Sequence, residues 1–208
     1  DEKKSVGKYS LGMRQKLSIA QAIMEKPDVL LLDEPTKGLD AFSKASLASL
    51  LQTLKNDGLC IFIVTHDVEF AAENARLNHV EDRVRFECAN CFDYLRAAQE
   101  AHQKFDVVIL DPPAFTKTRQ MTERALRGYK EINLRGMKLV REGGYQITCS
   151  CSQHVTPPLF REMLLDAQKD ARVKLRQVEW RTQGRDHPIL LSSPETEYLK
   201  CAIFQVLS

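Results

Sequence analysis

The chain has 208 residues, with 30 Lys and Arg against 28 Asp and Glu and a net charge of +2. This length allows one large domain or two small ones, and the near-neutral charge does not by itself indicate a nucleic-acid partner. The longest apolar runs, VLLL and CIFIV, are far shorter than the roughly 20 residues that cross a bilayer, and the first residues, DEKKSVGK, do not resemble a signal peptide. We therefore expect a cytoplasmic protein without membrane insertion.

The predicted elements begin with a helix over residues 10–25, which Pro27 stops. Apolar strand-like runs follow at 29–34, 60–65, 84–90, 105–111 and 145–150. Helical patterns alternate with them at 41–58, 67–80, 92–104, 122–140 and 158–171. Almost entirely apolar strands that alternate with helices predict a parallel sheet covered on both faces.

Two closing strands, at 173–180 and 198–207, have no helix between them and predict an antiparallel edge. The predicted fold is α/β: one doubly wound, Rossmann-like domain over residues 1–208. Its sheet is mostly parallel, with about seven strands, and the N-terminal helix lies outside the alternation.

The six cysteines of the chain are expected to be reduced thiols in a cytosolic protein. Cys88 and Cys91 form a CxxC pair, which is a pattern of zinc sites. The pair follows directly on an apparent strand, without the turn of a zinc ribbon, so we predict no metal site.

Four short motifs occur in order in the first third of the chain: SLGMRQ, VLLLDEP, GLD and VTHD. In this order they resemble the ATP-binding subunit of ABC transporters, over residues 1–72. The resemblance implies a signature motif, a Walker B carboxylate for magnesium, a glutamate for the attacking water, a D-loop and a switch histidine. The residues concerned are, in that order, Ser10 with Gly12 and Gln15, then Asp33, Glu34, Asp40 and His66.

The phosphate-binding loop GxxxxGK[ST] of such ATPases occurs nowhere in the sequence. Without it, the backbone amides and the lysine that hold the phosphates are missing. We therefore expect no binding of ATP with magnesium and no partner transporter subunit. Asp33 and Glu34 are then two solvated carboxylates at the end of a strand.

From about residue 73 to residue 208 the chain resembles a second family. This is the catalytic domain of the class I, S-adenosylmethionine-dependent, bacterial large-subunit ribosomal RNA cytosine-C5 methyltransferases. The resemblance implies S-adenosylmethionine as cofactor and ribosomal RNA as partner, with scattered cations for its phosphates at Lys117, Arg119, Arg124 and Arg127. The segments that carry it are ENARLNHVEDRV, CFDYL, FDVVILDPPAF, ALRGYKEINLRGMKLVREGG, ITCSCSQHV and HPILLSSPETEYLK.

Methylation of cytosine at C5 requires a nucleophile, because C5 reacts only after a thiolate has added to C6. By the resemblance, Cys151 is that nucleophile, and Asp111 is the natural partner for the ring nitrogen N3. Both follow apolar strands, at the edge where open α/β sheets bind ligands. The alternative for Cys149 and Cys151 is that both are small packing residues, and we expect that role for Cys149.

The cofactor site is expected to be incomplete. Pro112 and Pro113 fix the backbone after Asp111, Asn90 stands where the family has an acidic residue that contacts adenine, and Asp67 is placed for the ribose hydroxyls. The family's glycine-rich loop after the first strand is missing. The carboxylates at that strand end oppose the carboxylate of the cofactor, so we expect weak or no binding and an impaired or inactive enzyme.

The two resemblances meet in a helix at residues 71–74 and preserve the alternation of strand and helix. We therefore predict a chimera of an ATPase-derived segment, residues 1–72, and a methyltransferase-derived segment, residues 73–208. Two alternatives are an ATP-binding module of an export transporter, and an engineered scaffold of recombined folds without activity.

Overall fold

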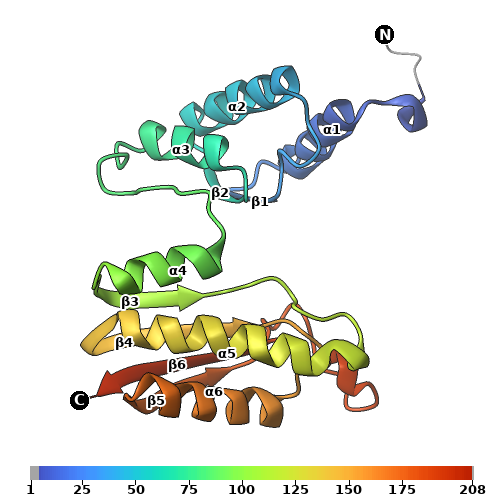
Figure 1. Ribbon diagram of the computed structural model, residues 1–208. Helices are drawn as coiled ribbons and strands as arrows, with labels where there is room; N and C mark the ends of the chain where they lie inside the picture. The colour runs from blue at the N-terminus through green and yellow to red at the C-terminus, as the bar shows by residue number, and fades with distance from the viewer. Residues whose placement is uncertain (1–4, 208) are drawn as a thin grey trace. The chain divides into compact units, whose positions relative to one another are not determined.

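The computed structural model describes residues 5–207, in two compact units, Asp1–Cys88 and Ala89–Ser208 (Figure 1). Each unit has its own sheet, one of two strands and one of four. The prediction of a single sheet with about seven strands is therefore wrong, although the α/β class is confirmed. No helix among residues 5–207 is long and apolar enough to cross a membrane.

The Asp1–Cys88 unit places three helices on one face of a parallel strand pair. After a short 3-10 helix, Val6–Lys8, the elements are α1 (Leu11–Ile23), β1 (Val29–Asp33), α2 (Ala41–Asn56), β2 (Cys60–Val64) and α3 (Val68–Leu77). Its core joins residues from all three helices to alternate residues of β1, as the period of two along a strand requires. The buried core residues are Ile19, Leu30, Leu32, Leu47, Leu51 and Phe70.

The Ala89–Ser208 unit contains the four-stranded sheet, in the order β3-β4-β6-β5. Its elements are α4 (Cys91–Glu100), β3 (Phe105–Leu110), the 3-10 helix Arg119–Met121, α5 (Thr122–Leu139), β4 (Val140–Ser150), α6 (Pro157–Ala171), β5 (Lys174–Arg181), the 3-10 helix Pro194–Thr196 and β6 (Lys200–Leu207). Strands β3 and β4 are parallel, whereas β6 is antiparallel to both β4 and β5. The predicted antiparallel C-terminal edge and the helix over 122–140 are confirmed.

The helices of this second unit cover one face of the sheet only. Helices α4, α5 and α6 share one core with the inward residues of β6, and Figure 1 shows α5 and α6 lying over the sheet. On the other face Val107 is 47% and Ile109 is 64% exposed. The prediction of a sheet covered on both faces is thus wrong. Helices cover the second face only where connections between strands also cross on that side of the sheet, and the described part of this unit contains no such connection.

The predicted strand at 84–90 is also absent. The structure has no helix or strand between Leu77 and Cys91, and residues 81–91 are all exposed. The segment VRFE alternates as a strand does, but no neighbouring strand pairs with its backbone, and an unpaired segment does not persist as a strand.

Candidate active site at the ends of strands β3 and β4

Cys151 and Pro112 approach each other at the carboxyl ends of two adjacent parallel strands. The thiol of Cys151 donates a weak hydrogen bond to the carbonyl oxygen of Pro112, with 4.0 Å between sulfur and oxygen. Cys151 is half-buried, and the loop that contains Pro112 begins directly after β3. The structure therefore brings together two of the site residues predicted from the sequence.

Asp111 lies at the same edge of the sheet. Leu110 and Thr148 form the last pair between β3 and β4, and Asp111 and Cys149 are the residues that follow them. Asp111 is exposed and Pro113 is also exposed, whereas Pro112 is half-buried. A carboxylate and a thiol thus flank one accessible edge, where ligands of α/β sheets bind.

Cys149 differs chemically from Cys151. It lies opposite Cys201 in the antiparallel pair β4·β6. Burial and a hydrogen bond with Cys201 raise the pKa of the Cys149 thiol to about 12. Cys149 is therefore a neutral thiol at physiological pH, in agreement with the packing role expected for it.

The backbone beneath Cys151 is held by buried polar contacts that the sequence did not indicate. The hydroxyls of Tyr129 and Ser152 are 2.8 Å apart, and the Ser152 carbonyl accepts a hydrogen bond from the Lys200 ammonium at 2.7 Å. Tyr129, Ser152 and Lys200 are all almost fully buried. The one signal in the sequence is a lysine at the start of the mostly apolar run KCAIFQVL. Its pairing with Ser152 depends on the antiparallel register.

Asn90 caps helix α4 close to this edge. Its side-chain oxygen accepts a hydrogen bond from the backbone N–H of Phe92 at 2.9 Å, as expected for an asparagine at a helix N-cap. The ring of Phe92 stacks at 6.0 Å on that of Phe115, in the loop after β3. Asn90 is thus near the Asp111 loop, but its oxygen is already used for capping.

The ATPase-like residues lie in the other unit, at the ends of β1 and β2. Glu34 has a left-handed backbone, with φ of 48°, and its Oε2 is 2.7 Å from Nδ1 of His66. This contact is an ion pair when His66 is protonated, and it lacks the geometry of a hydrogen bond. Asp33 is exposed at the end of β1. The structure therefore brings Glu34 and His66 together and leaves Asp33 solvated.

Three other predicted residues of this unit act as helix N-caps. The side chains of Ser10, Asp40 and Asp67 accept backbone hydrogen bonds at the starts of α1, α2 and α3. Asp67 also pairs with Lys44 of α2, and the hydrogen bond from Lys44 lowers the pKa of Asp67. Each of these side chains thus has a structural partner within its own unit, and Asp67 belongs to a different unit from Asn90 and Asp111.

Gly12 and Gln15 lie in the first turns of α1. A Cβ atom on Gly12 would come within 2.9 Å of the Ser43 hydroxyl oxygen, so the glycine allows close packing of α1 and α2. Gln15 is half-buried. The glycine at position 12 is thus explained by packing.

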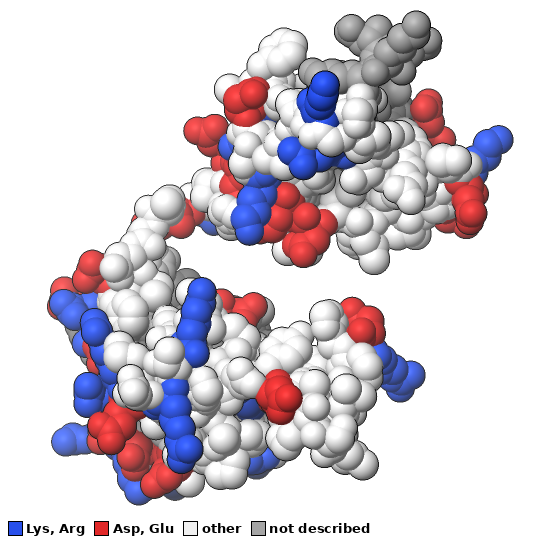
Figure 2. Space-filling view, turned by 90° about the vertical axis from the view of Figure 1, so that its right-hand side faces the viewer, with Lys and Arg blue, Asp and Glu red and all other residues white. Residues whose placement is uncertain are grey.

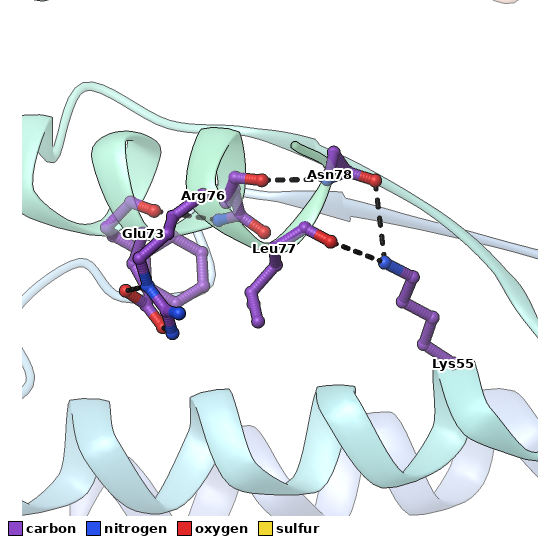
Figure 3. Close-up of polar contacts among 7 residues, drawn as sticks. Lys55, Glu73, Arg76, Leu77 and Asn78 are labelled. Atoms are coloured by element: carbon purple, nitrogen blue, oxygen red, sulfur yellow. Dashed lines mark hydrogen bonds and ion pairs between the residues drawn. The ribbon is translucent and has the colours of Figure 1, made fainter. Parts of the chain in front are cut away.

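An apolar groove between α2, β2 and α3 opens elsewhere in the first unit, with about 790 Å³ of space that includes open solvent. Figure 3 shows Lys55 of α2 at one end of it, where its ammonium donates to the Leu77 carbonyl and to Asn78 Oδ1 at 3.3 and 3.5 Å. Glu73, which lines the groove, pairs with Arg76 of α3. None of the predicted site residues lines this groove.

The charges on the surface do not form one continuous basic area on the face that Figure 2 presents. Lys and Arg side chains are interspersed there with Asp and Glu on both units. The four cations suggested for phosphates, Lys117, Arg119, Arg124 and Arg127, are exposed. Among residues 5–207, no group of three or more His, Cys, Asp and Glu side chains could hold a metal ion.

The fold is that of α/β methyltransferases. SMU.776, a candidate methyltransferase crystallised with SAH, matches with a TM-score of 0.53 at 15% identity, over 95% of this chain and 50% of its own. A candidate SAM-dependent methyltransferase from Streptococcus mutans also matches with a TM-score of 0.53, at 16% identity and over 95% and 50% of the two chains.

The main part of the sequence resembles ribosomal RNA large-subunit methyltransferases. A candidate enzyme of this name from Methanocaldococcus jannaschii is 39% identical over 140 residues, which is 67% of this chain and 36% of the relative. Ribosomal RNA large subunit methyltransferase I of Tolumonas auensis is 38% identical over 141 residues, again 67% and 36%. The chain thus spans about a third of the length of these relatives. The ABC transporter family model matches residues 1–37 only, which include Ser10 and Glu34 but neither Asp40 nor His66.

Proposed function

We propose that the Ala89–Ser208 unit is the catalytic half of an RNA cytosine-C5 methyltransferase, with Cys151 as nucleophile and Asp111 as the acid for the ring nitrogen N3. The contact between the Cys151 thiol and the Pro112 carbonyl carries this proposal, because it sets the thiol beside the loop that Asp111 begins. The names of the relatives support large-subunit ribosomal RNA as the substrate.

The step that these residues would perform is the addition to cytosine. The Cys151 thiolate forms a bond with C6, the electrons of the C5–C6 double bond move toward the ring nitrogen, and Asp111 delivers a proton to N3. C5 then becomes an enamine carbon able to accept an electrophile. When the thiolate leaves, C5 has lost its hydrogen, N3 returns its proton to Asp111, and the double bond between C5 and C6 forms again. Ala114 stands in the loop where some RNA cytosine methyltransferases have a second cysteine, so the C5 proton must leave through another base.

The residues suggested for S-adenosylmethionine do not fit a tight site. Asn90 uses its side-chain oxygen to cap α4, and Asp67 is paired with Lys44 and caps α3. The end of β1, where the resemblance implies glycine amides, carries Asp33 and Glu34 and belongs to the other unit. We therefore propose weak cofactor binding. In a calorimetric titration we expect no micromolar affinity, and such affinity would contradict the impaired cofactor site.

The proposed nucleophile is testable without the cofactor. A transcript of large-subunit ribosomal RNA that carries 5-azacytidine accepts a thiolate at C6 more readily than one with cytidine, because the ring nitrogen at position 5 makes C6 more electrophilic. We expect a protein–RNA adduct on a denaturing gel with the unmodified chain and with Cys149→Ala, and none with Cys151→Ala. An adduct that persists in Cys151→Ala, or no adduct with the folded unmodified chain, would contradict the assignment.

We further infer that residues 1–72 derive from an ATP-binding subunit and residues 73–208 from a methyltransferase. The match of residues 1–37 to the ABC transporter family supports the first assignment. The boundary falls inside helix α3, so the two halves of this helix would come from different families. Phe70 packs in the core of the first unit, and Leu77 and Asn78 bind Lys55.

A further inference from the structure

Tyr129 of α5 contacts both of the segments that carry the proposed site. Its hydroxyl is 2.8 Å from the hydroxyl of Ser152, the residue after Cys151. Its ring lies 4.5 Å, between centroids, from the ring of Phe115, in the loop that Asp111 begins. Tyr129 is 0% exposed. One buried side chain therefore joins the segment of the proposed nucleophile to the segment of the proposed acid.

Ser152 is held from several directions, which restrains the backbone beside Cys151. Its carbonyl accepts hydrogen bonds from the Lys200 ammonium at 2.7 Å and from the backbone N–H of Val155 at 3.1 Å. Its hydroxyl bonds with Tyr129, and the residue is 0% exposed. A buried polar group that loses its partner has no water to replace it, so these contacts resist displacement.

Phe115 fixes the loop after β3 against the helices. Its ring is inclined by 37° to that of Tyr129, and the ring of Phe92 in α4 stacks on its other neighbour position at 6.0 Å. A Cβ atom on Gly128 would come within 3.1 Å of the Phe115 ring, so the glycine lets the ring lie close to α5. The next residue, Thr116, is buried. Tyr129 is thus the core contact that holds the end of this loop.

Tyr129 is itself held firmly in the core. Its carbonyl accepts a hydrogen bond from Asn133 Nδ2 at 2.8 Å, and Asn133 Oδ1 accepts one from Gln146 Nε2 of β4 at 2.9 Å. The ring of Phe160 in α6 packs against it edge-on, at 5.8 Å and 81°. Hydrogen bonds of this kind are stronger in the interior than in water. Helix α5 is therefore tied to β4 on the same face that carries the Tyr129 hydroxyl.

We propose that Tyr129 is a positioning residue, which fixes the distance between the Cys151 thiol and the loop after β3. The contact of the Cys151 sulfur with the Pro112 carbonyl, at 4.0 Å, is the distance that it sets. The proposal rests on the proposed roles of Cys151 and Asp111. Because Tyr129 is fully buried, it touches neither RNA nor the reacting atoms and acts only through Ser152 and through the loop.

The first test measures the anchoring alone, by hydrogen exchange resolved to single amides. Tyr129→Phe keeps the ring and removes the hydroxyl. We expect the Val155 amide, which donates to the Ser152 carbonyl, to exchange about tenfold faster, as the loss of one buried hydrogen bond implies. Tyr94→Phe, at a 39% exposed position on α4, is the matched control and should leave this amide unchanged. Equal exchange in Tyr129→Phe and the parent would overturn the proposal.

The second test measures the effect on chemistry, by release of tritium from RNA that contains 5-tritiated cytidine. We expect Tyr129→Phe to lower the maximal rate by at least about tenfold, because small displacements of reacting groups cost this much or more. The RNA concentration that gives half the maximal rate should not change. Measurement well below the unfolding transition keeps both proteins folded, so a purely structural role would leave the maximal rate unaltered. An unaltered rate would overturn the proposal.

Two further variants identify the route by which Tyr129 acts. Ser152→Ala removes the same hydroxyl contact from the other side, so the double variant with Tyr129→Phe should be no slower than either single variant. Multiplied effects would overturn the route through Ser152. Should Tyr129→Phe not fold, Ser152→Ala takes its place in both tests. Phe115→Leu removes the contact between the rings, and an unaltered maximal rate in this variant would overturn the route through the loop.

Hydrogen exchange requires neither RNA nor a reaction, so the two proposals can fail separately. Faster exchange in Tyr129→Phe, with no tritium release by the unmodified chain, would refute the proposed nucleophile and keep the anchoring by Tyr129. Tritium release that is equally fast in the unmodified chain and in Tyr129→Phe would do the reverse.

Discussion

Cys149 and Cys151 are separated by one residue but have different chemistry. Cys149 faces Cys201 across the strand pair, and its raised pKa, about 12, keeps it protonated. Cys151 lies beyond the last paired residue, with its sulfur toward the Pro112 loop. The difference arises from the end of strand pairing at Ser150, which no spacing in the sequence specifies.

We predict that Cys149 reacts with iodoacetamide at pH 8 at least about tenfold more slowly than Cys151, because only the thiolate is a nucleophile. Peptide mass spectrometry after brief labelling measures this directly. Labelling in 6 M urea is the control, since unfolding removes the burial and should make the two rates similar. Equal labelling in the native protein would contradict the neutral state of Cys149.

The stability of the protein should depend on pH through Lys200. Its pKa is lowered from the ordinary value of 10.5 to about 8 in the folded state. Below pH 8 Lys200 is protonated in both the folded and the unfolded state, so the free-energy cost of burying its ammonium does not change with pH. Between pH 8 and 10.5 the unfolded chain binds more protons, so the free energy of unfolding contributed by this residue rises with pH.

We therefore predict that the free energy of unfolding of the unmodified chain, relative to Lys200→Met, increases between pH 8 and pH 10.5 and is flat from pH 6 to pH 7.5. Urea unfolding followed by the fluorescence of Trp180, in the same unit, measures the difference. A difference that stays constant over the whole range would contradict the lowered pKa of Lys200 in the folded state.

At the scale of the elements, the helices of the first unit are stabilised by side chains that also resemble catalytic groups. Asp67 accepts the backbone N–H of Phe70 at 3.1 Å and pairs with Lys44 of α2. A capping side chain and a catalytic carboxylate both occur at the end of a strand or the start of a helix, so sequence position alone cannot distinguish them.

Replacement of Asp67 by alanine should lower the free energy of unfolding of the first unit by about 1 kcal/mol, which is typical of a lost N-cap. The pKa of Asp67 is lowered in the folded state, so this contribution is present at neutral pH and is lost as the pH falls below the ordinary value of 3.8. Thermal unfolding at pH 7 and pH 3 checks both statements, with Asp57→Ala as a control. An Asp67→Ala variant as stable as the parent at pH 7 would contradict the capping role.

Helices were easier to predict than sheets. The amphipathic pattern at 122–140 and the proline at the start of α6 are local, and both helices form there. The strand with which another strand pairs is not determined by local sequence. VRFE, near Val84, has the alternation of a strand but no pairing, and the four-stranded order β3-β4-β6-β5 depends on which strands meet after folding.

The same reasoning applies to the site. The sequence predicted Asp111 and Cys151 from a family resemblance, and the contact of Cys151 with Pro112 is consistent with it. The sequence did not indicate Tyr129 or Ser152, because their hydroxyls meet only when α5 lies against the end of β4. Buried polar pairs of this kind are products of packing.

At the scale of the whole molecule, the chain has two cores and an exposed segment between them. The two clusters of buried residues lie in separate units, and residues 81–91 are exposed. In the first unit the uncovered face of the sheet carries Leu31 and Phe62, which are 73% and 59% exposed. Apolar faces of this kind favour association with other surfaces.

We predict that brief digestion with trypsin cuts first after Arg83 or Arg85, because exposed segments without regular structure are the preferred sites of cleavage. The expected product is a stable fragment that begins near residue 84 or 86 and retains the four-stranded sheet, detected by mass spectrometry and circular dichroism. Arg83→Gln with Arg85→Gln should slow this cleavage. First cuts within α5 or α6 would contradict the division into units.

The most direct test of the proposed chemistry is the release of tritium from RNA that contains 5-tritiated cytidine, without S-adenosylmethionine. Addition of Cys151 to C6 lets C5 exchange its hydrogen with water before the thiolate leaves. We predict release by the unmodified chain and by Cys149→Ala, and a fall of about 10,000-fold, or to background, in Cys151→Ala. No release by the folded unmodified chain at saturating RNA, or equal release by Cys151→Ala, would contradict the proposed nucleophile.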